Sequence, residues 1–136
     1  MDSEQPDPKP CALVVDDDSL IRMDIVDILE EAGFRTLEAP TGDEALKVLH
    51  EHHSQVSVLF TDVQMPGHHD GFALARRTAS TYPHISIVVA SGRFEPGPDD
   101  MPEGARFIGK PFSAKMVHRH LQEALPDEQK PPQLKR

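Results

Sequence analysis

Carboxylate, hydroxyl and ammonium side chains in this 136-residue sequence directly follow short apolar runs. These groups are Asp16, Asp17 and Asp18 after 12–15, Asp62 after 56–61, Ser91 after 85–90 and Lys110 after 105–109. Clustered carboxylates repel one another unless a cation compensates, and hard oxygen ligands of this kind favour Mg²⁺. A lysine and a hydroxyl suit the oxygens of a phosphoryl group. The set therefore predicts transfer of a phosphoryl group onto or off a carboxylate.

Asp62 is the leading candidate for the reactive residue. It ends an apolar, β-branched run and precedes a turn at Pro66-Gly67, so it is expected at the C-terminal tip of a strand. In open α/β sheets this edge borders the ligand-binding crevice. A strand-final Asp before such a turn also serves as a turn former or helix cap, so its role depends on the rest of the chain.

The elements that must position these groups alternate along the chain. Strands are expected at 12–15, 34–39, 56–61, 85–90 and 105–109, and helices at 19–32, 44–52, 72–81 and after Ser113. Thr41, Asp70 and Ser113 have the types and spacing of helix caps. Apolar strands that alternate with amphipathic helices predict a doubly wound α/β fold, with a parallel sheet covered on both faces.

The segment between the fourth and fifth strands departs from this alternation. Pro96, Pro98 and Pro102 leave room for about one turn of helix near 99–104. The fourth helix is therefore expected to be shortened or irregular.

Length and composition limit the class of protein. One domain is expected at 11–125, between Pro-rich and charged flexible tails at 1–10 and 126–136. The net charge of −9 disfavours nucleic acid and anionic membrane as partners. No apolar run approaches the roughly 20 residues that a membrane span needs, and the first ten residues are unlike a signal peptide. A single cysteine, Cys11, agrees with a reducing compartment, and a cytoplasmic location is expected.

Four motifs in order resemble the signature of the response-regulator receiver domain of two-component signalling. They are Val14-Val15-Asp16-Asp17, Asp62 with Met65-Pro66-Gly67, Ser91-Gly92 and Lys110-Pro111-Phe112. The resemblance covers roughly residues 11–125. It implies a flavodoxin-like, doubly wound five-stranded sheet of order 2-1-3-4-5, in a stand-alone, single-domain response regulator.

The resemblance also implies a role for each matching residue. Asp62 would be the phosphoacceptor, and Mg²⁺, for which Mn²⁺ can substitute, would bind Asp62 and three further groups. These further groups are the carboxylates of Asp16 and Asp17 and the backbone carbonyl of Gln64. The remaining implied roles are phosphoryl contact for Lys110, a cis bond at Pro111, switching for Ser91 and Phe107, and tuning of the phosphate's lifetime for Gln64 and Arg93.

Partners follow from the same resemblance. The phosphoryl donor would be a sensor histidine kinase or a histidine phosphotransfer protein. The domain would catalyse its own phosphorylation and dephosphorylation, without acting as an enzyme on a separate substrate. The signal would pass to an unknown downstream protein by contact or by phosphorelay, with no nucleic acid or membrane involved.

Two other classes stay open from the sequence. A haloacid-dehalogenase-like phosphatase would use Asp16 as the nucleophile of an Asp-x-Asp motif, although Leu20 replaces the usual Thr or Val and the chain is too short for the usual cap. A receiver-like binding module that acts without phosphorylation is the second alternative. All the reactive residue types are present, which speaks against this second class.

Overall fold

The computed structural model describes residues 9–65, 70–92, 95–97 and 99–135, and the account below is limited to them. The strands are β1 (Cys11–Val15), β2 (Arg35–Ala39), β3 (Val56–Asp62), β4 (Ser86–Ser91) and β5 (Arg106–Gly109). The α-helices are α1 (Ser19–Glu31), α2 (Gly42–His52), α3 (Gly71–Thr81) and α4 (Ala114–Ala124). Two short 3₁₀ helices follow, η1 (Asp127–Gln129) and η2 (Pro132–Leu134). The strands and α-helices agree with the expected ranges to within two residues.

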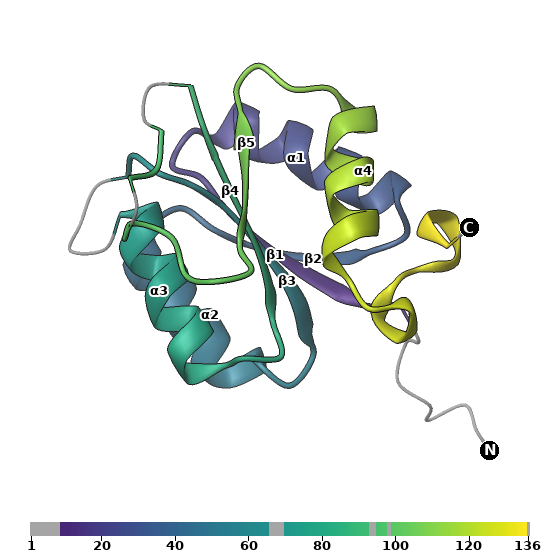
Figure 1. Ribbon diagram of the computed structural model, residues 1–136, viewed down its shortest axis with the longest axis horizontal. Coiled ribbons are helices and arrows are strands. Elements are labelled where there is room, and N and C mark those ends of the chain that lie inside the picture. The colour runs from purple at the N-terminus through teal and green to yellow at the C-terminus, as the bar shows by residue number, and fades with distance from the viewer. Residues whose placement is uncertain (1–8, 66–69, 93–94, 98, 136) are drawn as a thin grey trace.

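The five strands form one parallel sheet of order β2-β1-β3-β4-β5. In Figure 1, α1 and α4 cover one face of the sheet and α2 and α3 cover the other. This arrangement confirms the expected doubly wound fold of order 2-1-3-4-5.

Alternation of side chains along the central strands supplies both faces of the sheet with a core. Leu13 and Leu59 belong to the cluster on the α2 and α3 side, whereas Val14 and Phe60 belong to the cluster on the α1 and α4 side. All four side chains are fully buried. Strands that are buried on both faces have continuous apolar sequences, which is why these strands could be predicted from the sequence.

Side-chain caps begin all four α-helices. The Asp18 carboxylate accepts hydrogen bonds from the backbone N–H groups of Leu20 and Ile21 at 2.9 and 3.2 Å. The expected caps are confirmed at the other three helices: Thr41 accepts from Glu44 N, Asp70 from Ala73 N and Ser113 from Met116 N. Each cap satisfies an amide that the helix itself leaves without a partner.

The connection between β4 and β5 is irregular, as expected, but the single turn of helix expected near 99–104 is absent from its described residues. Its described residues, 95–97 and 99–105, contain turns and no helical turn. The Asp100 carboxylate accepts a hydrogen bond from Gly97 N at 2.7 Å, and the Asp100 carbonyl accepts one from Arg76 of α3 at 2.8 Å. These local bonds, together with Pro96 and Pro102, replace the backbone ladder of a helix.

The C-terminal segment also differs from the expected flexible tail. Residues 126–135 fold back, and Leu134 packs in the core cluster beneath α1 and α4 at 2% exposure. The Gln122 side chain donates a hydrogen bond to the Leu134 carbonyl at 3.3 Å. Gly33 has a φ of +104°, and a Cβ atom there would lie 2.3 Å from the Gln133 side chain. The segment is therefore packed against the domain, whereas the expected tail at 1–8 lies outside the described residues.

Across the part of the chain that the structure describes, no helix combines the length and apolar character that a membrane crossing requires.

Candidate functional site

Strand register brings the predicted polar groups to one edge of the sheet. Val15 pairs with Thr61, so Asp16 and Asp62 follow neighbouring positions of β1 and β3. Asp62 pairs with Ala90 of β4, and Ser91 pairs with Gly109 of β5. The last residues of β3 and β4 and the residues that follow β1 and β5 therefore lie at the same edge of the sheet, where ligands bind in open α/β folds.

A surface cavity lies at this edge. Its described lining consists of Asp16, Asp17, Asp18, Ile21, Asp62, Gln64, Met65, Ser91, Gly92 and Lys110. The structure thus brings together the predicted phosphoacceptor, the predicted metal-binding residues, the lysine and the strand-final serine.

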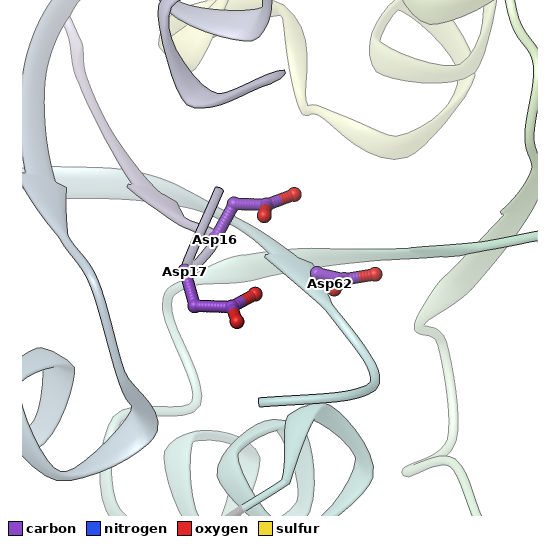
Figure 2. Close-up of side chains that lie close together, drawn as sticks. All are labelled: Asp16, Asp17 and Asp62. Atoms are coloured by element: carbon purple, nitrogen blue, oxygen red, sulfur yellow. The ribbon is translucent and has the colours of Figure 1, made fainter. Parts of the chain in front are cut away.

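Three carboxylates in this cavity lie close enough together to hold a divalent cation. One carboxylate oxygen from each of Asp16, Asp17 and Asp62 lies within 4.8 Å of the other two. Figure 2 shows that the first two side chains leave one loop, that the third leaves the neighbouring strand and that all three project to the same side. Oxygen-only ligands of high negative charge suit Mg²⁺, which keeps several waters and takes few protein carboxylates.

Lys110 brings a positive charge into contact with this cluster. Its Nζ lies 3.1 Å from Asp62 Oδ1 and 3.5 Å from Asp16 Oδ2. The side chains of Lys110, Asp62 and Asp16 are 22%, 13% and 1% exposed, so solvent screens these pairs less than it screens surface pairs. Lys110 N donates to the Ser91 carbonyl at 3.0 Å, which holds the lysine beside the end of β4. The Lys110–Pro111 bond is cis, as predicted.

Asp16 is the most enclosed carboxylate of the cluster. Burial raises its pKa above the ordinary value of an aspartate, while a hydrogen bond from Asp18 N and the charge of Lys110 act in the opposite direction. The Asp18 N–H lies 2.9 Å from Asp16 Oδ1. The hydrogen bond and the lysine hold the carboxylate in place, while burial makes its charged form more costly.

The raised pKa of Asp16 predicts a pH dependence of cation binding. A protonated carboxyl is a poor ligand, so Mg²⁺ affinity should fall as the pH is lowered toward the raised pKa. The loss of Mg²⁺ affinity should begin at a higher pH than it would if Asp16 had the ordinary aspartate pKa of about 3.9. Calorimetric titration with Mg²⁺ from about pH 8 down to about pH 4 checks this, and an affinity that stays constant over the whole range would contradict it.

A close backbone contact fixes the position of Asp62. Gly71, the first residue of α3, donates its N–H to the Val63 carbonyl at 2.8 Å. A Cβ atom on Gly71 would lie only 1.9 Å from the Asp62 carbonyl oxygen. Only glycine lets the helix start so near the strand end, so the contact between α3 and β3 holds the end of the strand that carries Asp62.

The other predicted site residues have different positions. Ser91 is buried at the cavity, and Gln64 is exposed on its lining. Phe107 of β5 is half-buried and packs against the core cluster on the α2 and α3 side, away from the described lining of the cavity. Arg93, together with Pro66 and Gly67 of the turn after β3, lies outside the described residues.

Two residues that the sequence did not single out, Arg22 and Glu38, support the loop at residues 16–18, here called the acidic loop. Arg22 of α1 donates from Nη1 to the Asp16 carbonyl at 2.7 Å and from Nε to Glu38 of β2 at 2.9 Å. No motif in the sequence pairs positions 22 and 38, because their contact depends on how α1 packs beside β2. The only sequence signal for a role of Arg22 near this loop was its position four residues, or one helical turn, after Asp18.

The chain matches the family model of the response regulator receiver domain over residues 12–122. It is 32% identical to the response regulator receiver protein CpdR of Brucella abortus, over 83% of this chain and 94% of CpdR. It is 34% identical to the sensor kinase CckA of the same organism, over 83% of this chain and 12% of CckA. Among solved structures, the receiver domain of NtrX from Brucella abortus is 31% identical, with a TM-score of 0.74 over 84% of this chain and 97% of that one.

Fold, site and sequence similarity define one class of protein, a phosphoryl-accepting signalling domain of α/β architecture. The chain belongs to the response regulator receiver domain family of two-component systems. Family membership implies that an aspartate accepts a phosphoryl group.

Proposed function

We propose that Asp62 is the phosphoacceptor and that a divalent cation held by Asp16, Asp17 and Asp62 is required for the transfer. The observation that carries this proposal is the convergence of the three carboxylates within 4.8 Å, with Lys110 Nζ 3.1 Å from Asp62. Asp62 is also more accessible than the neighbouring Asp16, with side chains 13% and 1% exposed. A nucleophile must reach the donor's phosphorus atom, so this difference favours Asp62.

The proposed reaction is an in-line displacement. A carboxylate oxygen of Asp62 attacks the phosphorus of a phosphohistidine, the O–P bond forms, and the P–N bond to the imidazole breaks. The electron pair stays on the imidazole nitrogen, which takes a proton from water. A small acyl phosphate such as acetyl phosphate would serve in the same way, with a carboxylate as the leaving group. Attack of water on the aspartyl phosphate formed at Asp62 would reverse the modification and release phosphate.

The site's own residues control charge during this step. Lys110 would exchange its ion pair with Asp62 for contact with a phosphoryl oxygen, so a cation stays beside the charge that develops. When bound, Mg²⁺, or Mn²⁺ in its place, would neutralise charge on the phosphoryl oxygens and hold the phosphoryl group with its phosphorus facing Asp62. The backbone carbonyl of Gln64 is proposed as a further ligand, since Gln64 lines the same cavity.

Phosphorylation would act as a switch through the same groups. It converts one carboxylate charge into a dianionic group with strong acceptors, which gives Ser91 and Lys110 a new partner. Phe107 is proposed to respond, because it lies in β5, the strand that Lys110 directly follows. Gln64 and Arg93 are proposed to tune the lifetime of the phosphate.

The proposed partners are a sensor histidine kinase or histidine phosphotransfer protein as donor and a downstream protein as recipient. The similarity to CckA, which is a sensor kinase, supports a donor of this kind. In this proposal the domain catalyses its own phosphorylation and dephosphorylation.

Incubation with acetyl phosphate and Mg²⁺, followed by intact-mass measurement, tests the proposal. Wild type should gain one phosphoryl group only when Mg²⁺ is present, and Asp62→Asn should gain none. Asp70→Asn is the matched control, because Asp70 caps α3 and an asparagine there keeps the capping oxygen. Equal phosphorylation of wild type and Asp62→Asn would refute the role of Asp62.

The phosphatase alternative predicts a different result. It requires steady turnover of a phosphomonoester that is lost in Asp16→Asn and kept in Asp62→Asn. The surroundings of Asp16 speak against it, because one oxygen accepts from Asp18 N and the other lies 3.5 Å from Lys110. The phosphorylation-independent module predicts no mass gain with acetyl phosphate or with a phosphohistidine donor.

A further inference from the structure

We infer that Arg22 is a positioning residue that sets the affinity of the acidic site for a divalent cation by holding the backbone of the loop at Asp16. The inference rests on the proposed cation site. It adds to that proposal a residue from outside the matching motifs and lets the two be tested separately.

The Arg22 guanidinium joins three elements at the site. It extends from α1, its Nη1 donates to the Asp16 carbonyl at 2.7 Å, and its Nε lies 2.9 Å from Glu38 Oε1 on β2. The Arg22 side chain is only 18% exposed. A planar guanidinium carries its donors in a fixed geometry, so these two bonds also fix the orientation of the group.

The acidic loop is held from several sides, and Arg22 holds its backbone oxygen. Asp16 N donates to the Ala39 carbonyl at 3.2 Å, next to Glu38 in β2. Asp16 Oδ1 accepts from Asp18 N, and Asp16 Oδ2 lies near Lys110. The Asp16 carbonyl belongs to the peptide unit that joins Asp16 to Asp17, so holding it limits movement of the backbone from which both carboxylates extend.

Arg22 contacts this carbonyl and leaves the carboxylates to Lys110 and the cation. A cation on a carboxylate would compete with Mg²⁺, whereas a hydrogen bond to the backbone orients the ligands without occupying their oxygens. Groups that orient ligands in this way typically change metal affinity by about 10- to 100-fold when removed.

The direction of the change in Mg²⁺ affinity distinguishes a positioning role of Arg22 from a purely electrostatic one. Arg22→Gln removes a positive charge close to the acidic cluster, and Coulomb's law alone would then make Mg²⁺ bind more tightly. The positioning role predicts the opposite, a Mg²⁺ dissociation constant raised by about tenfold. Once Mg²⁺ is saturating, phosphorylation of the variant by acetyl phosphate should approach the wild-type rate, because the attacking and phosphoryl-binding groups are unchanged.

Calorimetric titration of the folded proteins with Mg²⁺ is the test. Arg22→Lys keeps the charge and one donor position, so its dissociation constant should lie between those of wild type and Arg22→Gln. Arg106→Gln is the matched control: Arg106 also bridges a glutamate and a second acceptor, Glu123 and His120, but it lies at the other end of β5 from Lys110. Its dissociation constant should equal that of wild type.

The results of these titrations test the positioning role and the proposed function separately. An unchanged or lower dissociation constant in Arg22→Gln would overturn the positioning role while leaving the proposed function intact, as would an equal rise in Arg106→Gln. Thermal unfolding of each variant shows that the titrations report on folded protein. A wild type that binds no Mg²⁺ would overturn the proposed function and this inference with it.

Discussion

The Lys110→Met variant should accept phosphoryl groups from acetyl phosphate at least about 100-fold more slowly than wild type. Removal of one preorganised group that stabilises developing charge typically costs 10²–10³ in rate. Lys110 Nζ is placed for this task, 3.1 Å from the Asp62 oxygen and 3.5 Å from Asp16. Methionine preserves the length and apolar stem of the side chain, so the loss would report on the ammonium group. Time-resolved intact-mass measurement at saturating Mg²⁺ gives the rate.

The Mg²⁺ affinity of the Lys110→Met variant should not fall, in contrast to its rate of phosphorylation. Lys110 competes with a bound cation for the carboxylates, so its removal should leave Mg²⁺ affinity equal or higher. Lys115→Met is the control, since Lys115 is exposed on α4 and does not line the cavity. A Lys110→Met protein that is phosphorylated at the wild-type rate would remove Lys110 from the mechanism.

The Gly71→Ala variant should be destabilised by about 3 kcal/mol, the upper part of the range for overpacked positions. The added Cβ would lie 1.9 Å from the Asp62 carbonyl oxygen, and the neighbours within reach are backbone atoms of Asp62 and Val63. Backbone cannot move aside as a flexible side chain can, so α3 must shift away from β3. A domain of this size should lose about 10 °C in Tm, and the displaced strand end should also slow phosphorylation.

Gly109→Ala supplies the comparison for this effect. Gly109 also lies at a strand end beside the site, but a Cβ there meets nothing within 4 Å. Its free energy of unfolding should stay within about 0.5 kcal/mol of wild type. Equal stabilities of the two variants in urea titration would show that the contact of Gly71 with Asp62 does not constrain the fold.

The sequence predicts the sheet and the acidic part of the site because both depend on local patterns. Buried parallel strands such as 12–15 and 56–61 are continuous apolar runs, and Gly33 and Pro83 mark the ends of helices. Once the strand order is known, register alone places Asp16, Asp62 and Lys110 together. Thr41, Asp70 and Ser113 were predictable as caps because a cap acts on amides two or three residues away.

Features that depend on packing between distant segments could not be predicted. Leu134 is the one apolar residue among the charges and prolines of 126–135, so composition indicated a flexible tail. Its burial depends on the surface that α1 and α4 present, which no local pattern describes. The contact of Arg22 with Glu38 is of the same kind, and so is the turn that Asp100 and Arg76 stabilise before β5. In each case the partner lies on another element, and only the folded arrangement supplies it.

The location of the phosphoryl group tests the central claim most directly. After reaction with acetyl phosphate and Mg²⁺, borohydride reduction converts an aspartyl phosphate to homoserine, which peptide mass spectrometry assigns to a position. We expect homoserine at position 62 in wild type, absent without Mg²⁺ and absent from Asp62→Asn. Homoserine at position 16 or 17, or a phosphoryl group that resists reduction, would contradict the assignment of Asp62 as phosphoacceptor.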